Sequence, residues 1–355
     1  MRENGPSIVG RGAAGNPKNR FETLEIVPDY EDLDPEELEP EKPATVYLKD
    51  HARSIVTPND SPDIGFDAGI SPYRGCSHGC AYCFSRPNHE YLGLSAGLDF
   101  ETKILVKENA PDLLRKKLFS PRWEPKALAM SDSTDVYQPI EKKLRLTRCC
   151  LEVLTEFRNP VVIITKNHLV TRDLDLLSEL ARHDAVSVNI SLTTLDDDLR
   201  RVMEPRTSSP KRRLAAIEKL AGAGVPVGAL TAPIIPGLND HELPSLLRAA
   251  SDAGARFAGY TPVRLPYAVA PLFEDWLDRH FPDRKDKVLN HIREIRGGKL
   301  NDPRFGSRMS GEGVYAEHIA RLFEVGCRRA GLNNGRRHSL STAAFRRFGQ
   351  PTLFN

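Results

Sequence analysis

The sequence lacks any long apolar run, and this absence argues against a membrane-spanning helix. A bilayer span needs about 18 or more consecutive apolar residues, and no stretch of the 355-residue chain approaches that length. The first residues, MRENGPSIVGRG, also lack the apolar segment of a secretory signal. The sequence therefore predicts a cytoplasmic protein with no membrane partner.

Cysteine is scarce, and net charge is nearly absent. Six cysteines in 355 residues do not form the dense disulfide framework of a small secreted domain. The 50 basic and 48 acidic side chains leave a net charge of +2, too little for a polycation. The charge is unevenly placed, because residues 31–42 are acidic and residues 325–355 are rich in arginine. Both segments are typical of solvated tails, with a binding role as the second interpretation.

Apolar patterning divides the chain into four parts. Residues 1–45 show no apolar periodicity and predict a disordered arm. Residues 46–265 alternate short apolar runs with amphipathic stretches, which is typical of a core of βα units. Residues 266–332 have the pattern of helices without strands, a helical extension packed on that core, and residues 333–355 predict a basic flexible tail.

Six apolar runs predict buried strands. They are short and either rich in β-forming residues or almost continuously apolar, as strands covered on both faces should be. Six consecutive βα units imply an α/β fold with a parallel sheet, either open or curled into a partial barrel. The predicted strands are 66–72, 126–131, 160–165, 185–192, 225–231 and 255–262.

Three cysteines lie within eight residues, directly after the first predicted strand. Cys76, Cys80 and Cys83 have the spacing C-x3-C-x2-C in SPYRGCSHGCAYCF. Three thiolates from one loop suit a cubane iron–sulfur cluster in which the fourth iron stays open. Gly75 and Gly79 allow the backbone to wrap tightly around such a group.

Two other interpretations of these cysteines remain open. A structural zinc ion needs four ligands, commonly supplied as two pairs, and the chain has no second C-x2-C pair. The fourth ligand would have to be His78, His89 or Cys149. The third interpretation is that Cys76, Cys80 and Cys83 are inert, buried thiols. For the other three cysteines, Cys149, Cys150 and Cys327, we expect a packing role.

The cysteine motif, with Tyr82 before its third cysteine, resembles the signature of radical S-adenosylmethionine (SAM) enzymes. That resemblance implies a partial (β/α)6 barrel of the TIM type. From about residue 55 to residue 332, the chain also resembles the subgroup that contains spore photoproduct lyase. The similar segments are NDSPDIGFDAGISPYRGCSHGCAYCFSRP, STDVYQPIEKKLRLTR, ITKNHLVTRDLDLL, SLTTLDDDLRRVMEPR, APIIPGLNDHE and FGSRMSGEGVYA.

The resemblance implies an activity and its cofactors. The family holds a [4Fe–4S] cluster and SAM, and one electron cleaves SAM to methionine and a 5′-deoxyadenosyl radical that abstracts hydrogen. The electron would come from a flavodoxin- or ferredoxin-like donor. The substrate and the reaction type, lyase or transferase, are left open, with nucleic acid as one candidate substrate. The alternative is a non-catalytic metal-cluster protein that associates with nucleic acid or a sliding clamp.

The resemblance also suggests residues that would contact the methionine and ribose groups of SAM. Lys166 ends the third predicted strand and matches a family lysine, so we expect it at the methionine carboxylate. Ser191 ends the fourth strand and can bind the same carboxylate. Glu204 would bind ribose and Arg206 the carboxylate, unless the two form a surface ion pair. With them, Thr207 and Arg213 complete a family-like E-x2-T…R pattern.

Adenine and the amino group of SAM need further partners. Tyr82 and the turn at 234–237 should pack around adenine. The usual Gly-Gly-Glu after the second strand is absent, and we expect Ser131, Asp132 or Asp135 to take its place as ligand of the amino group. In spore photoproduct lyase, a cysteine in the equivalent stretch returns a hydrogen atom to the substrate radical. This chain has no cysteine in that stretch, so we do not expect it to repair the spore photoproduct.

The last residues resemble short peptides that dock on the bacterial DNA sliding clamp. Gln350, Leu353 and Phe354 match a Gln-x-x-Leu-Phe pattern, although Pro351 stands where leucine is usual. Such peptides insert an apolar pair into a preformed groove. A chance resemblance in a tail is the competing interpretation.

Overall fold

The computed structural model describes residues 8–22, 43–131, 133–334 and 339–347. Its main sheet has seven strands in the order β10-β9-β8-β7-β6-β3-β2. Six of them are parallel and adjacent in chain order, which is the arrangement of a (β/α) barrel. They are β3 (Ala68–Ile70), β6 (Leu128–Met130), β7 (Val161–Thr165), β8 (Val186–Ser191), β9 (Val227–Ile234) and β10 (Phe257–Pro262).

These six strands coincide with the six predicted runs, so the predicted α/β fold is confirmed. The strands are short and mostly buried, as the near-continuous apolar runs required. The sheet ends at β10 on one side and at the antiparallel β2 (Val56–Pro58) on the other, so within the described residues the barrel is partial.

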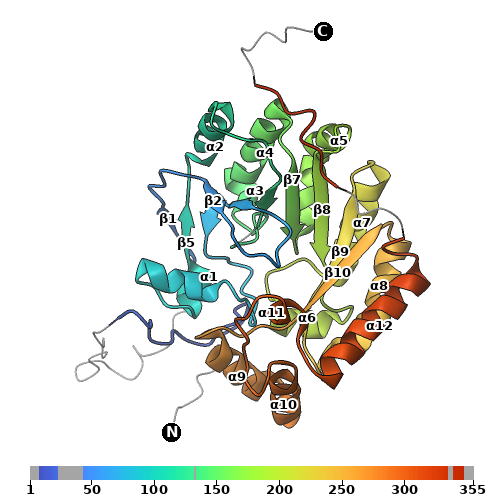
Figure 1. The fold of residues 1–355 in the computed structure, drawn as a ribbon. Helices are drawn as coiled ribbons and strands as arrows, with labels where there is room; N and C mark the ends of the chain where they lie inside the picture. The colour runs from blue at the N-terminus through green and yellow to red at the C-terminus, as the bar shows by residue number, and fades with distance from the viewer. Residues whose placement is uncertain (1–7, 23–42, 132, 335–338, 348–355) are drawn as a thin grey trace, which may run out of the picture.

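Helices connect the parallel strands and lie outside the sheet (Figure 1). Their apolar stripes pack on the strands in one large core, which contains Leu114, Leu154, Leu177 and Leu220 from four helices. The helices of this layer are α2 (Ala110–Phe119), α3 (Glu141–Leu144), α4 (Leu146–Phe157), α5 (Leu174–Ala181), α6 (Asp197–Met203), α7 (Pro210–Gly222) and α8 (Leu243–Asp252). Short 3₁₀ turns, η2 (His168–Asp173) and η3 (Asp240–Glu242), precede α5 and α8.

A second, three-stranded sheet was not predicted. It joins β1 (Val46–Lys49), β5 (Lys103–Val106) and β4 (Tyr73–Arg74). Its strands have two to four residues, and β1 is exposed along its whole length. Strands of two to four residues are too short to be recognised as separate apolar runs in the sequence. Between β4 and β5 lie the 3₁₀ helix η1 (Arg86–Leu92) and α1 (Leu98–Thr102).

The C-terminal helices pack on the barrel in two places. α9 (Val269–His280) and α10 (Lys285–Ile295) belong to a cluster that contains Phe273 and Trp276 together with Cys80 and Tyr82. α12 (Val314–Ala330) packs its apolar face into the main core, through Ile319. A 3₁₀ turn, η4 (Pro282–Arg284), and the one-turn α11 (Ser307–Ser310) complete this extension.

Parts of both predicted tails pack against the core. Residues 8–22 run between α1 and α9 in Figure 1, and Arg11, Gly12 and Ala13 are buried there. At the other end, the backbone N–H of Arg346 donates to the carbonyl of Phe157. The arm predicted over 1–45 and the flexible tail predicted over 333–355 therefore each contain an ordered segment. The N-terminal segment docks through hydrogen bonds to Glu101, and in the C-terminal segment Phe345 packs against the main core.

Among the described helices, none combines the length and the apolar character that crossing a membrane would require.

Candidate functional site

The three clustered cysteines lie on a loop, residues 75–84, that we call the cluster loop. Cys76 and Cys80 are buried, Cys83 is partly exposed, and all three are free thiols. Gly75 and Gly79 adopt positive φ angles of 77° and 68°. A Cβ on Gly79 would lie 2.6 Å from Oε2 of Glu101, so the loop follows a path that a side chain at this position would obstruct.

A buried ion pair fixes one side of the cluster loop. Arg86 donates to the carbonyl of Cys80 at 3.1 and 2.9 Å and to Oε1 of Glu101 at 2.5 Å. Both side chains are fully buried. Glu101 also accepts the backbone N–H groups of Gly12 and Ala13 at 3.1 and 2.9 Å. The same carboxylate therefore ties residues 8–22 to the cluster loop.

A buried amide fixes the other side. The backbone N–H of Ser77 donates to Oε1 of Gln138 at 3.0 Å, and Nε2 of Gln138 donates to the carbonyl of Gly75 at 3.2 Å. The hydroxyl of Thr134 donates to the same carbonyl at 2.8 Å. Sequence reasoning missed Arg86, Glu101 and Gln138 as positioning residues, although Arg86 and Gln138 lie in segments that resemble the family.

Asp135 joins the cluster loop to the end of β7. Its carboxylate accepts the Thr165 hydroxyl and the backbone N–H groups of Lys166 and Tyr137, and it lies 3.4 Å from Nδ1 of His78. With four protein groups around it, this carboxylate has a positioning role here. Whether Asp135 also binds the SAM amino group stays a prediction. Of the alternatives, Ser131 accepts the N–H of Val136, and Asp132 lies outside the described residues.

His78 is a buried titratable group on the cluster loop. Burial opposes its protonation, yet the Asp135 carboxylate and the Cys76 thiol outweigh burial and raise the pKa of His78 to about 10. Burial would also raise the pKa of Cys76, but the neighbouring His78 lowers it on balance. Burial dominates at Cys80 and Cys83 and raises the pKa of both thiols.

A second polar group faces the cluster loop from α6, α7 and the end of β7. The Tyr82 hydroxyl donates to Glu204, and the guanidinium of Arg213 binds the other oxygen of that carboxylate. Lys166 places Nζ 5.9 Å from the centre of the Tyr82 ring. Burial would raise the pKa of Glu204, but Arg213 and then Lys166 outweigh it and lower the pKa. The structure thus brings Tyr82, Lys166 and Glu204 together.

Arg206 does not join this group. Its guanidinium is exposed and donates to the carbonyl of Gly10 at 3.1 Å, so the alternative of a Glu204–Arg206 ion pair is wrong. Arg213 takes that place, because it lies one turn inside α7 and points back at the end of β8. There it also donates to the carbonyl of Ser191 at 3.0 Å, and the Ser191 side chain is buried beside it. Binding of Arg206 to the SAM carboxylate stays a prediction.

The expected adenine contacts form part of an apolar cluster. Tyr82, Ile235 and Leu238 are buried with Met203 and with side chains of α9 and α10. Of the residues predicted to pack around adenine, Tyr82 and Ile235 therefore share this cluster, whereas Ile234 packs in the main core. Whether they also contact adenine stays a prediction.

The other candidate metal ligands have separate partners. Nε2 of His89 lies 2.9 Å from the carbonyl of Lys103, and Nε2 of His78 lies 3.3 Å from the Asn167 amide. Cys149 and Cys150 lie in α4, where Cys150 is fully buried in the core, and Cys327 packs in α12. Within the described residues, no three His, Cys, Asp or Glu side chains surround a single ion position.

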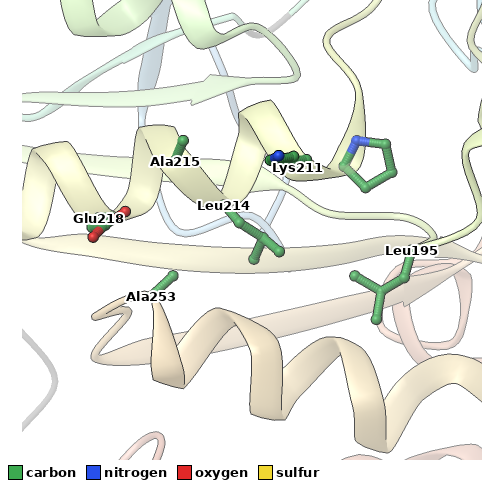
Figure 2. A pocket seen from close by; sticks show the side chains of 7 residues that line it. Leu195, Lys211, Leu214, Ala215, Glu218 and Ala253 are labelled. Carbon is green, nitrogen blue, oxygen red and sulfur yellow. The ribbon is translucent and has the colours of Figure 1, made fainter.

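A surface pocket lies elsewhere, along α7 (Figure 2). No cysteine and no residue of the cluster loop lines it, so we do not place the chemistry there. Its lining residues are Leu195, Pro210, Lys211, Leu214, Ala215, Glu218 and Ala253.

Residues 70–250 match the family model of the Radical SAM superfamily. An uncharacterized protein of Mycobacterium tuberculosis is 38% identical over 228 residues, covering 64% of this chain and 66% of the relative. An uncharacterized protein of Methanocaldococcus jannaschii is 31% identical over 195 residues, covering 55% of this chain and 70% of the relative. The chain thus spans 66% of the length of the mycobacterial relative.

Solved structures of spore photoproduct lyase share the fold. The complex with dinucleoside spore photoproduct has a TM-score of 0.57 and 18% identity, covering 81% of this chain and 80% of the other. A cysteine-to-serine mutant of that enzyme has a TM-score of 0.58 with the same identity and coverage. At this identity, the likeness concerns the arrangement of the chain alone.

Proposed function

Because the chain belongs to the radical SAM superfamily, we propose that it cleaves SAM reductively at a [4Fe–4S] cluster and abstracts hydrogen from a substrate. The observation that carries this proposal is the cluster loop. It presents three free thiols, two of them buried, beside the carboxyl ends of parallel strands, where such folds bind ligands.

The donor set fits a cubane better than a single zinc ion. A zinc ion needs about four donors, each about 2.3 Å or less from one point. The described residues contain no such group, and His78 and His89 are engaged elsewhere. Three thiolates of a cubane bind three different irons and leave the fourth open. Cys76, Cys80 and Cys83 would be these ligands.

When bound, the cluster supplies the electron that splits SAM into methionine and the 5′-deoxyadenosyl radical. We propose a flavodoxin- or ferredoxin-like protein as the source of that electron. The chain's own residues orient the cosubstrate. Ser191 ends β8 and Lys166 directly follows the adjacent β7, and their side chains would bind the methionine carboxylate.

Glu204 acts mainly as a positioning residue in this proposal. Its carboxylate binds both the Tyr82 hydroxyl and Arg213, and it therefore holds Tyr82 against the cluster loop. Arg213 in turn fixes the carbonyl of Ser191 at the end of β8. The apolar cluster around Ile235 and Met203 would keep water from the radical.

The test is anaerobic reconstitution with iron and sulfide, followed by reduction with dithionite in the presence of SAM. We expect 5′-deoxyadenosine and methionine in equal amounts. A cluster-loaded protein that forms neither would favour the non-catalytic alternative. The clamp-like residues 350–354 lie outside the described residues, and binding to a clamp stays a proposal.

A further inference from the structure

Exposed aromatic rings gather near the cluster loop, and each is covered on one face by an arginine. Five exposed rings have a guanidinium carbon within 5.5 Å of the ring centroid. We call this set the aromatic rim. Its members are Phe21, Phe84, Tyr91, Tyr267 and Phe305, each between 53% and 70% exposed.

Arg20 is the centre of the outer part of the rim. Its guanidinium lies 4.7 Å from the ring of Phe21, 5.2 Å from Tyr91 and 4.0 Å from Tyr267. The rings of Phe21 and Tyr91 are themselves 4.9 Å apart. Three segments far apart in sequence thus supply neighbouring rings, which is why no local pattern in the sequence indicates an aromatic surface.

The inner part of the rim begins beside the thiols. Phe84 follows Cys83 directly, and the guanidinium of Arg264 lies 5.5 Å from its ring. Residues 84–91 and 264–267 each contribute to both parts, so the rim runs from the cluster loop outward. Arg308, on α11, covers Phe305 at 4.5 Å.

Among the described residues, Arg264 is the rim arginine without a carboxylate partner. Arg20 lies 3.3 Å from Glu90, and Arg308 binds both oxygens of Asp63. Arg264 instead has Nη1 3.6 Å from the sulfur of Met309, and its buried Nε has no acceptor in the described part of the chain. A guanidinium without a carboxylate partner can bind an oxyanion of a ligand, such as a phosphate, through two N–H groups.

We infer that the aromatic rim binds single-stranded nucleic acid, with bases stacked on the open ring faces and a phosphate at Arg264. The inference rests on the proposed function, because this strand would be the substrate. Each nucleotide carries a planar base and an anionic phosphate, and the rim offers aromatic rings for the bases and arginines for the phosphates. A duplex keeps its bases stacked inside, so only an unpaired strand or a flipped base offers these faces.

The test is fluorescence anisotropy of a labelled oligothymidylate of about twelve nucleotides, within the usual site sizes of strand-binding proteins, titrated with the cluster-loaded protein at several salt concentrations. The double variant Tyr91→Ala, Tyr267→Ala should bind at least about fivefold more weakly, since stacking contributes that much or more per base. The matched control is Tyr47→Ala, Phe119→Ala, which removes two exposed rings outside the rim. It should bind like the unaltered protein.

Arg264→Gln should lower the salt slope of binding by about one, because it removes one phosphate contact. Undetectable binding by the unaltered protein, or equal losses in the two double variants, would overturn the inference. So would equal displacement by polyglutamate of the same charge. SAM cleavage measured without oligonucleotide separates the two proposals. If the unaltered protein does not cleave SAM, the proposed function is refuted. If it cleaves SAM but does not bind the oligonucleotide, only the inference about the aromatic rim is refuted.

Discussion

The buried pair Arg86–Glu101 offers a quantitative test of how the cluster loop is held. In Glu101→Gln, the side chain keeps its shape but loses the charge that compensates Arg86. Removing one partner of a buried ion pair costs about 3–5 kcal/mol. We take the lower end, about 3 kcal/mol, because the Gln oxygen can still accept one of the N–H groups that Glu101 binds. At about 2 °C per kcal/mol in a chain of this size, Tm should fall by about 6 °C.

The assay is thermal unfolding combined with trypsin digestion. Residues 8–22 contain Arg11, Lys18 and Arg20, and losing the Glu101 carboxylate should release this segment to trypsin. The matched control is Glu179→Gln, which breaks an exposed pair with Arg182. Exposed pairs contribute at most about 1 kcal/mol, so Tm should fall by no more than about 2 °C. Equal shifts in the two variants, with unchanged digestion, would refute the proposed role of Glu101.

Three further predictions address the cosubstrate, pH and the tail. Lys166→Ala should weaken SAM binding about tenfold to a hundredfold by calorimetry on cluster-loaded protein, because a charge-assisted hydrogen bond contributes about 1.5–3 kcal/mol; unchanged affinity would remove Lys166 from the site. Arg308 lowers the pKa of Asp63 from 3.8 to about 2, so this pair stabilises the fold above pH 3.8 and loses that effect as pH falls through about 2. Asp63→Asn should accordingly destabilise the apoprotein at about pH 6 but hardly at about pH 2, and a difference in Tm that does not shrink on acidification would contradict this. A labelled 345–355 peptide should bind the host's sliding clamp at roughly micromolar Kd and lose binding with Leu353→Ala; no binding at about a hundred micromolar would make the clamp motif a chance resemblance.

The parallel sheet could be predicted because each of its strands is a buried apolar run. The cluster loop could be predicted because cysteine spacing is local in the sequence. The positions of Lys166 and Ser191 could also be predicted, because each lies at the end of a strand that the apolar runs predict.

The positioning groups could not be predicted, because they depend on contacts between distant segments. Glu101 binds Gly12 from 89 residues away, and nothing in the polar segment 8–22 indicates that it docks. Arg213 was named only as part of the family-like E-x2-T…R pattern, and the turn into α7 that brings it back to the Glu204 carboxylate is not visible in the sequence. The aromatic rim is likewise assembled from separate loops.

The central claim is that Cys76, Cys80 and Cys83 hold a [4Fe–4S] cluster, and iron and sulfide analysis after anaerobic reconstitution tests it most directly. The unaltered protein should contain about four iron and four sulfide per chain. Alanine at any of the three positions should remove most of both, while Cys149→Ala should keep the full content because Cys149 lies apart in α4. Stoichiometric zinc without iron uptake, or full iron content in the Cys80→Ala variant, would contradict the account.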